Sequence, residues 1–258
     1  MKLLILPGDG IGPEIMDATR LVLDAAQARF NFTLEIVEDV IGFPSLEIHG
    51  TTIRDDVVAT AKAVDGVILG PVSHNDYPPS DEGGINPSGV LRKQLDLYAN
   101  IRPAKSRKGV PTPTGRPMDL IIVRENTEGF YADRTMVVGN GEFMPTDDLA
   151  LAVRKVTRVG SKRIAEQAFA LATRRRKKVT AIHKSNVLRI SDGLYLEEVR
   201  AVAKANPSTE YEEELVDAMA AHLIRSPERF DVVVATNMFG DILSDEASEL
   251  SGGLGLAA

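Results

Sequence analysis

The sequence predicts an α/β protein built around parallel sheets. Short apolar strands at 3–6, 34–40 and 66–70 alternate with helical patterns, and this rhythm is typical of consecutive strand–helix–strand units. Further apolar strands at 119–123, 179–183 and 232–235 continue the alternation with helices. Neither an internal repeat nor a low-complexity tract interrupts it.

Helical periodicity predicts helices that begin after residue 12 and at 52–63, 86–97, 149–174, 193–205 and 215–223. Residues 105–117 form a basic segment rich in Pro and Gly, which indicates a boundary or a crossing between domains. Residues 132–146 are irregular, with a strand expected at 136–138, and are long enough to form an arm that reaches a partner.

Composition excludes several classes of function. The chain has 258 residues, a formal net charge of −7 and no cysteine, which excludes disulfides, thiolate metal sites and a cysteine nucleophile. The acidic balance disfavours binding to nucleic acid or to an anionic membrane. Because no apolar stretch reaches eighteen residues, we expect a cytoplasmic protein. The basic run 174–178 is explained by the negative end of a helix dipole.

The first strand ends in a turn that contains Gly8, Gly10 and Gly12. This spacing differs from the G-x-G-x-x-G of a Rossmann dinucleotide site, and Pro13 fits the first turn of a helix. A tight turn between strand and helix also requires glycines without any ligand.

Two carboxylates stand at the start of the helix that follows strand 232–235. Asp241 and Asp245 are four residues apart, so they share one helix face. A hard divalent cation prefers such oxygen ligands, although a helix cap and a solvated carboxylate would explain the same pattern.

Several cationic or phenolic groups stand at the ends of predicted elements: Arg92, Arg102, Arg124 and Tyr131. Guanidinium groups bind carboxylates bidentately, so three arginines can hold a di- or tricarboxylate inside an acidic protein. Any one of them alone would more often be an ordinary surface arginine.

Two further residues are candidates for chemistry. Lys184 follows a buried strand, where a lysine can act as a base. Asp217 lies among apolar residues of a predicted helix, so we expect it to be buried and to need a partner, for which a metal is one option.

Six motifs occur together and in order: 6–14 (LPGDGIGPE), 91–103 (LRKQLDLYANIRP), 123–131 (VRENTEGFY), 183–187 (HKSNV), 216–219 (VDAM) and the closing stretch 237–256. In these motifs the chain resembles the isocitrate/isopropylmalate dehydrogenase family, the metal-dependent β-decarboxylating dehydrogenases. The resemblance covers essentially the whole sequence.

The resemblance implies a two-domain isopropylmalate-dehydrogenase-like α/β fold that differs from the ordinary Rossmann fold. Residues 1–98 with 252–258 would form a cofactor-side domain, incomplete at its C-terminus, and residues 99–251 a second domain with the dimer interface and the arm. It also implies a homodimer whose active sites are shared between subunits. Chains of the family continue past the position of Ala258, so we expect this sequence to be part of a longer one.

The resemblance also assigns roles to residues. Tyr131 would protonate the enolate carbon, and Lys184 would help to deprotonate the substrate hydroxyl. Asp217, Asp241 and Asp245 would bind Mg²⁺ or Mn²⁺, with Lys184 and Asp217 coming from the neighbouring subunit. The residues that would bind substrate are Asn86, Ser88, Arg92, Arg102, Arg124 and Val187, and those that would contact the cofactor are Ile11, Leu69 and Gly255.

The segment before Arg92 bears on specificity. Asn86 and Ser88 could bind a polar substituent of malate, whereas Val90 and Val187 could line an apolar one; Asn86 could instead simply cap a helix that begins with Pro87. The implied function is oxidative decarboxylation of a 3-substituted malate, of the 3-isopropylmalate or homoisocitrate type. The implied cofactor is NAD, and NADP is the alternative. The alternatives are an isocitrate or tartrate dehydrogenase and an inactive regulatory subunit.

Overall fold

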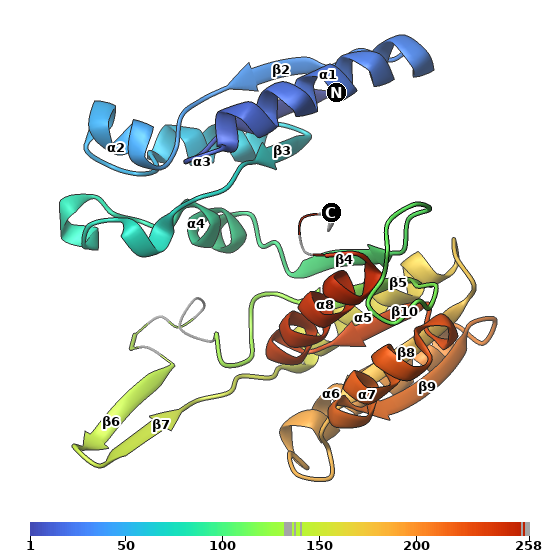
Figure 1. Cartoon of the computed structure of the whole chain (residues 1–258). Helices are drawn as coiled ribbons and strands as arrows, with labels where there is room; N and C mark the ends of the chain where they lie inside the picture. The colour runs from blue at the N-terminus through green and yellow to red at the C-terminus, as the bar shows by residue number, and fades with distance from the viewer. Residues whose placement is uncertain (132–135, 137, 140, 254, 256–258) are drawn as a thin grey trace. The chain divides into compact units, whose positions relative to one another are not determined.

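The computed structural model describes residues 1–131, 136, 138–139, 141–253 and 255, and the chain divides into two compact units, Met1–Asp96 and Leu97–Ala258 (Figure 1). The predicted placement of 97–98 and 252–258 in the first domain stays a prediction, because most of the closing residues lie outside the described part. The strand expected at 136–138 also falls partly outside it.

The first unit contains the predicted parallel sheet. Its strands are β1 (Lys2–Leu6), β2 (Glu35–Glu38) and β3 (Gly66–Leu69), in the order β2-β1-β3. The helices are α1 (Gly12–Phe30), α2 (Phe43–His49), α3 (Asp55–Ala63) and α4 (Pro87–Gln94). Leu4 and Leu6 of the central strand pack with Val57 of α3 and Leu91 of α4, which places one apolar core at the sheet.

The glycines after β1 serve close backbone packing. A Cβ atom on Gly12 would lie 2.0 Å from the Pro7 carbonyl oxygen, and one on Gly70 would lie 1.9 Å from the same oxygen. The turn after β1 and the end of β3 can therefore meet only if both residues lack side chains. Close packing therefore explains the glycine at position 12 without a bound ligand.

The carboxylate of Asp9, which is 4% exposed, ties together the loops at this end of the sheet. It accepts the main-chain N–H groups of Phe43 and Ser73 at 2.7 and 2.8 Å, and also the Tyr77 hydroxyl. Burial and the hydrogen bond to Asp9 raise the pKa of Tyr77. The loops after β1, β2 and β3 are thus held by one side chain.

The second unit has a five-stranded sheet in the order β4-β5-β10-β8-β9. The strands are β4 (Ala99–Lys105), β5 (Asp119–Glu125), β8 (Lys178–His183), β9 (Glu210–Leu215) and β10 (Val232–Ala235). Only the pairing of β4 with β5 is antiparallel; the other pairs are parallel. Charged β9, at one edge, is absent from the sequence-based prediction.

Helices cover both faces of this sheet (Figure 1). On one face α5 (Arg158–Ala172) and α6 (Ser191–Ala205) bury Phe169, Tyr195 and their apolar neighbours. On the other, α7 (Val216–Arg225) and α8 (Asn237–Ser251) bury Met219 and Leu243. Buried strands covered on both faces are expected to be continuously apolar, as the Val-rich β10 is.

The helix predicted over 149–174 is wrong in its first part. Residues Leu149–Ala152 form β7, which pairs antiparallel with β6 (Glu142–Thr146). Helix α5 begins only at Arg158, where the Thr157 side chain caps it by accepting the Gly160 N–H at 3.0 Å. Figure 1 shows the hairpin standing apart from the five-stranded sheet, and its Phe143, Met144 and Leu151 side chains are exposed.

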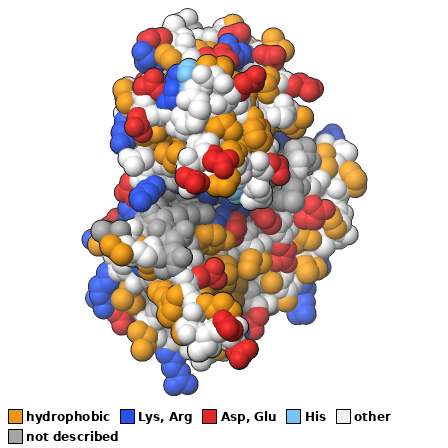
Figure 2. Space-filling view, turned by 90° about the vertical axis from the view of Figure 1, so that its left-hand side faces the viewer, with side chains coloured by type: hydrophobic (Ala, Val, Ile, Leu, Met, Phe, Trp, Pro, Cys, Tyr) orange, Lys and Arg blue, Asp and Glu red, His pale blue; other side chains and the backbone are white. Residues whose placement is uncertain are grey.

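The basic run 174–178 is used inside the unit. Arg175 pairs with Asp231 at 2.7 Å and with Asp119 at 2.6 Å, and Lys178 pairs with two glutamates of β9. In the face shown in Figure 2, acidic and basic side chains are interspersed. Among the described residues, no helix combines the length and apolarity needed to cross a membrane.

Arg175→Met is expected to lower the free energy of unfolding by about 3 kcal/mol, because it leaves the Asp231 carboxylate, which is 1% exposed, without its cationic partner. Urea denaturation measures the change. Arg174→Met, at the exposed neighbouring position, is the control and should change stability by less than about 0.5 kcal/mol. Equal effects of the two substitutions would contradict the structural role of Arg175.

Candidate active site

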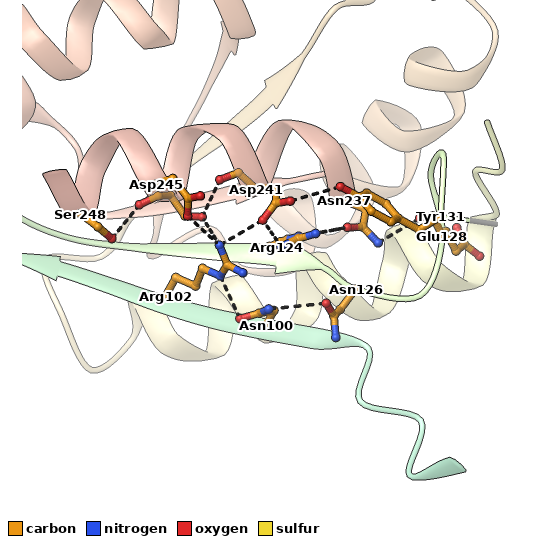
Figure 3. A network of polar contacts seen from close by, with 11 residues as sticks. Asn100, Arg102, Arg124, Asn126, Glu128, Tyr131, Asn237, Asp241, Asp245 and Ser248 are labelled. Atoms are coloured by element: carbon orange, nitrogen blue, oxygen red, sulfur yellow. Dashed lines mark hydrogen bonds and ion pairs between the residues drawn. The ribbon is translucent and has the colours of Figure 1, made fainter. Parts of the chain in front are cut away.

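Two arginines and two aspartates of the second unit form one polar cluster (Figure 3). Arg102 lies on β4 and Arg124 near the end of the neighbouring β5, while Asp241 and Asp245 lie one turn apart on α8. Strand β10 is the direct neighbour of β5, and α8 follows β10 in the sequence. The helix therefore lies close to β5, the strand that carries Arg124. The predicted shared face of the two aspartates is directed at the arginines.

Arg102 contacts both carboxylates. Its Nη1 lies 3.1 Å from Asp241 Oδ1 and 3.2 Å from Asp245 Oδ1, and it donates to the Ser244 hydroxyl at 2.7 Å. The Asn100 side chain accepts from Arg102 Nε at 3.3 Å. The guanidinium is therefore oriented from two sides.

Arg124 is the buried member of the cluster. Its side chain is 3% exposed and forms an ion pair with Asp241. Nε and Nη2 of Arg124 both donate to the Asn237 side-chain oxygen, at 3.0 and 2.7 Å. Asn237 in turn donates to the Glu128 carbonyl at 2.9 Å, so its amide is fixed in one orientation.

Asn237 is a site residue to which the sequence assigned no role. Its position in the sequence could have indicated a role. Asn237 is a polar residue just after the buried strand β10, and this position is at the functional edge of an α/β sheet. Gly240 belongs to the same arrangement: a Cβ there would lie 2.8 Å from Cβ and Cγ of Arg124. The close approach of α8 to Arg124 thus requires glycine at this position.

Tyr131 joins the cluster from the loop after β5. Its hydroxyl donates to Asp241 Oδ2 at 3.1 Å, and its ring centroid lies 5.6 Å from Cζ of Arg124. A phenol, two guanidinium groups and two carboxylates therefore meet in one place.

Lys184 and Asp217 form a separate pair. Lys184 follows β8 and Asp217 stands in the first turn of α7 after β9; Lys184 Nζ lies 2.7 Å from Asp217 Oδ1. The expectation that Asp217 is buried is wrong for the single chain, since its side chain is 64% exposed. On the same helix Met219 and Leu223 are buried, and Asp217 is two residues before Met219 and so lies on the opposite face. The hydrogen bond from Lys184 lowers the pKa of Asp217.

The two groups occupy different parts of the sheet. In the strand order, β5 and β9 are three places apart, which at about 4.8 Å between neighbours corresponds to roughly 14 Å. Among the described residues, no set of three or more His, Cys, Asp or Glu side chains is arranged to hold a metal ion. One chain offers Asp241 and Asp245 as a carboxylate pair, which fits the oxygen donors that Mg²⁺ and Mn²⁺ take but leaves their coordination open.

The other predicted site residues lie on separate elements. In the first unit, Ser88 and Arg92 lie on α4, and Asn86 caps it through a hydrogen bond from Gly89 N at 3.1 Å. Leu69 is the last residue of β3 and pairs with Leu6 at the end of β1, whereas Ile11 is the N-cap residue of α1 in the connection that follows β1.

Two predicted site residues of the second unit lie outside these groups. Val187, in the loop after β8, is 67% exposed. Gly255, predicted to contact the cofactor, is exposed beyond the end of α8, and both of its neighbours are outside the described residues.

The structure is that of an α/β protein in which a carboxylate pair and two arginines meet beside a mixed sheet. A model of the isocitrate/isopropylmalate dehydrogenase family matches residues 2–258, and the chain belongs to that family. The predicted α/β fold of the isopropylmalate dehydrogenase type is confirmed.

The similar proteins are dehydrogenases. The chain is 41% identical to a 3-isopropylmalate dehydrogenase of Sulfurisphaera tokodaii. The alignment covers 98% of this chain and 70% of the relative. It is 39% identical to a homoisocitrate dehydrogenase of Methanocaldococcus jannaschii, over 100% of this chain and 73% of the relative. The crystal structure of isocitrate dehydrogenase from Methylococcus capsulatus superposes with a TM-score of 0.85 at 40% identity, over 100% of this chain and 73% of that chain.

The family and these relatives support a decarboxylating dehydrogenase. The chain spans about 70% of the length of the relatives that it matches.

Gly240→Ala and Gly193→Ala should change stability in opposite directions. Both glycines lie in helices, where alanine is favoured by up to about 1 kcal/mol. At Gly193 a Cβ meets nothing within 4 Å, so stability should rise. At Gly240 overpacking against Arg124 costs about 1–3 kcal/mol, so stability should fall. Chemical denaturation of both variants tests this, and a stabilised Gly240→Ala protein would contradict the close contact.

Proposed function

We propose that this protein oxidatively decarboxylates a 3-substituted malate, of the 3-isopropylmalate or homoisocitrate type, with NAD and with Mg²⁺ or Mn²⁺. The observation that carries the proposal is the convergence of Arg102, Arg124 and Tyr131 on the carboxylates of Asp241 and Asp245. A metal-binding pair and anion-binding groups are thus available within one cluster.

The charges of the cluster support this assignment. The positive charges of Arg102 and Arg124 balance the negative charges of Asp241 and Asp245. A divalent cation and a substrate dianion can therefore enter together without changing the net charge of a partly buried site, which avoids the cost of burying an unpaired charge. Asp241 and Asp245 would then hold the cation, and Arg102 and Arg124 would pair with the substrate carboxylates in place of the aspartates.

The remaining residues have complementary roles. Arg102 and Arg124 hold the malate carboxylates through bidentate hydrogen bonds. Arg92, on α4 of the first unit, is a further candidate substrate-binding arginine. Lys184 Nζ, in its uncharged amine form, accepts the proton of the C2 hydroxyl and becomes an ammonium group, and the Tyr131 hydroxyl donates its proton to the carbon that loses CO₂. The Tyr131 hydroxyl contacts Asp241 and Lys184 Nζ contacts Asp217, two aspartates that the proposal assigns to the metal, and these contacts support the two roles.

The metal would be held by Asp241 and Asp245 of one chain and Asp217 of a second copy. There Mg²⁺ or Mn²⁺ would supply a Lewis acid for the oxygen atoms of the substrate, and NAD would supply the hydride acceptor. Ile11 and Leu69 support a cofactor site in the first unit, because the carboxyl edge of a parallel sheet is where α/β proteins bind such groups.

The environment of α4 favours an apolar substituent on the malate. The Asn86 side-chain oxygen is engaged in capping the helix, which reduces its capacity to bind a polar substituent. The second candidate is isocitrate, because a relative of Thermus thermophilus that is 40% identical is an isocitrate/homoisocitrate dehydrogenase. Tartrate and a non-catalytic subunit remain the further alternatives.

The protein of full natural length, given Mn²⁺ and NAD, should reduce the cofactor with 3-isopropylmalate or homoisocitrate faster than with isocitrate or tartrate. Removal of the metal with EDTA should abolish the reaction. Tyr131→Phe and Lys184→Ala should each lower kcat by about 10²–10⁴-fold, the usual contribution of general acid–base catalysis. Absorbance at 340 nm follows the reaction.

Arg174→Ala, an exposed change outside the cluster, is the control for this assay and should leave kcat unchanged. No turnover with any of the four acids would overturn the dehydrogenase assignment and favour the non-catalytic subunit. A preference for isocitrate would select the second candidate.

Shared active sites predict complementation between two inactive variants. A dimer of one Lys184→Ala chain and one Asp241→Asn chain contains one site with intact Asp241 and Lys184, whereas each homodimer contains none. Random pairing of equal amounts after co-expression should therefore give about one quarter of wild-type activity. Activity no higher than the sum of the two parents would show that each chain completes its own site.

A further inference from the structure

A buried ion pair between Arg154 and Asp192 lies outside the cluster described above. Their side chains are 8% and 0% exposed, and Arg154 Nη1 lies 2.6 Å from Asp192 Oδ1. The same Nη1 donates to the Ser191 hydroxyl at 2.9 Å, and Nη2 donates to the Thr236 hydroxyl at 3.0 Å. Segments far apart in the sequence thus meet at one guanidinium.

This ion pair reaches Lys184 through the main chain. Asp192 Oδ2 accepts the Lys184 N–H at 2.6 Å. The segment between them is closed by hydrogen bonds from Leu188 N to the Lys184 carbonyl at 2.8 Å and from Asp192 N to the Leu188 carbonyl at 3.0 Å. The other end of the lysine is held by Asp217, at 2.7 Å from Nζ. The main chain and the ammonium group of Lys184 are therefore fixed by two carboxylates on different helices.

The same guanidinium also contacts the start of α8. Thr236 is the N-cap residue of this helix, and Cζ of Arg154 lies 5.4 Å from the ring centroid of Phe239 in its first turn. Asp241 and Asp245 follow on the same helix. Arg154 thus fixes the lysine loop relative to the helix that carries the aspartates.

Stability alone does not explain the ion pair. Removing two charges from water is costly, and replacing a buried pair by apolar residues is often neutral or stabilising. A buried pair with hydrogen bonds on several sides instead fixes a geometry. Catalysis needs such a geometry, because a misplacement of about 1 Å can cost 10²-fold in rate.

We propose that Arg154 and Asp192 are positioning residues that hold Lys184 where it can take the proton of the substrate hydroxyl. The proposal rests on the proposed function, since it assumes this role for the lysine. Asp192 acts through the main chain of Lys184, and Arg154 acts by orienting Asp192 and anchoring it to α8.

Steady-state kinetics of Arg154→Met and Asp192→Asn test the proposal in the protein of full natural length, with 3-isopropylmalate, Mn²⁺ and NAD, or with whichever of the four acids turns over fastest. We expect kcat to fall about tenfold or more, while KM for the acid and for Mn²⁺ stays within about threefold, because the chemical step rather than ground-state binding is affected. Arg154→Lys keeps the charge and one donor and should recover part of kcat.

Arg175→Met is the matched control. It also removes an arginine from a buried aspartate of the same unit, but at the opposite edge, where Asp119 and Asp231 stand at the amino ends of β5 and β10. It should lower stability and leave kcat unchanged. This comparison separates positioning from a general loss of stability.

Amide hydrogen exchange gives a readout that does not depend on turnover. Exchange in the peptide that contains Lys184 should accelerate about tenfold in Asp192→Asn and Arg154→Met relative to Arg175→Met, because the main-chain N–H loses its fixed acceptor.

Folded Arg154→Met and Asp192→Asn proteins that keep kcat within twofold of wild type would overturn the proposal, whatever their exchange rates. If Arg154→Met does not fold, Arg154→Lys and Ser191→Ala decide by the same criterion. If the wild-type protein turns over none of the acids, the proposed function fails instead, and unchanged exchange at Lys184 would then overturn the positioning role separately.

Discussion

The burial of the Arg124 guanidinium is the constraint on which the site depends. A buried charge is tolerated only when it is paired and hydrogen-bonded, and here Asn237 and Asp241 supply the partners. Both belong to α8, so the helix must lie against the end of β5. Because Gly240 has no side chain, the helix can come close enough. The same placement directs Asp245, one turn further on, at Arg102.

Most of the fold could be predicted from hydrophobic periodicity, because the parallel strands are covered by helices and are therefore continuously apolar. The edge strand β9 (Glu210–Leu215) could not, since it is rich in glutamate. Its charges are tolerated because Lys178 and Arg200 of neighbouring elements pair with them. The segment at Leu149 has a helical pattern but forms a strand, because the cap at Thr157 starts the helix later and β6 supplies a pairing partner.

For the site, the sequence indicated candidate residues but not the contacts that hold them in place. Asp241 and Asp245 share a face because helical spacing alone dictates it. The exposure of Asp217 follows from helical spacing, because it lies two residues before the buried Met219 and therefore on the opposite face of α7. Asn237 and the ion pair between Arg154 and Asp192 depend on contacts between segments distant in sequence, which periodicity cannot reveal.

The β6–β7 hairpin and the segment that follows it differ in the number of specific contacts that they make within the chain, and therefore in how well they tolerate substitution. The hairpin is exposed in the single chain, so packing within the chain does not restrict its length and composition. The next few residues are not: Arg154 binds Asp192, Lys155 pairs through its main chain with Gly129, and Thr157 starts α5. Segments grafted in place of the hairpin should therefore join before residue 153 and leave residues 154–157 unchanged, because these residues make the contacts that fix this part of the chain within the second unit.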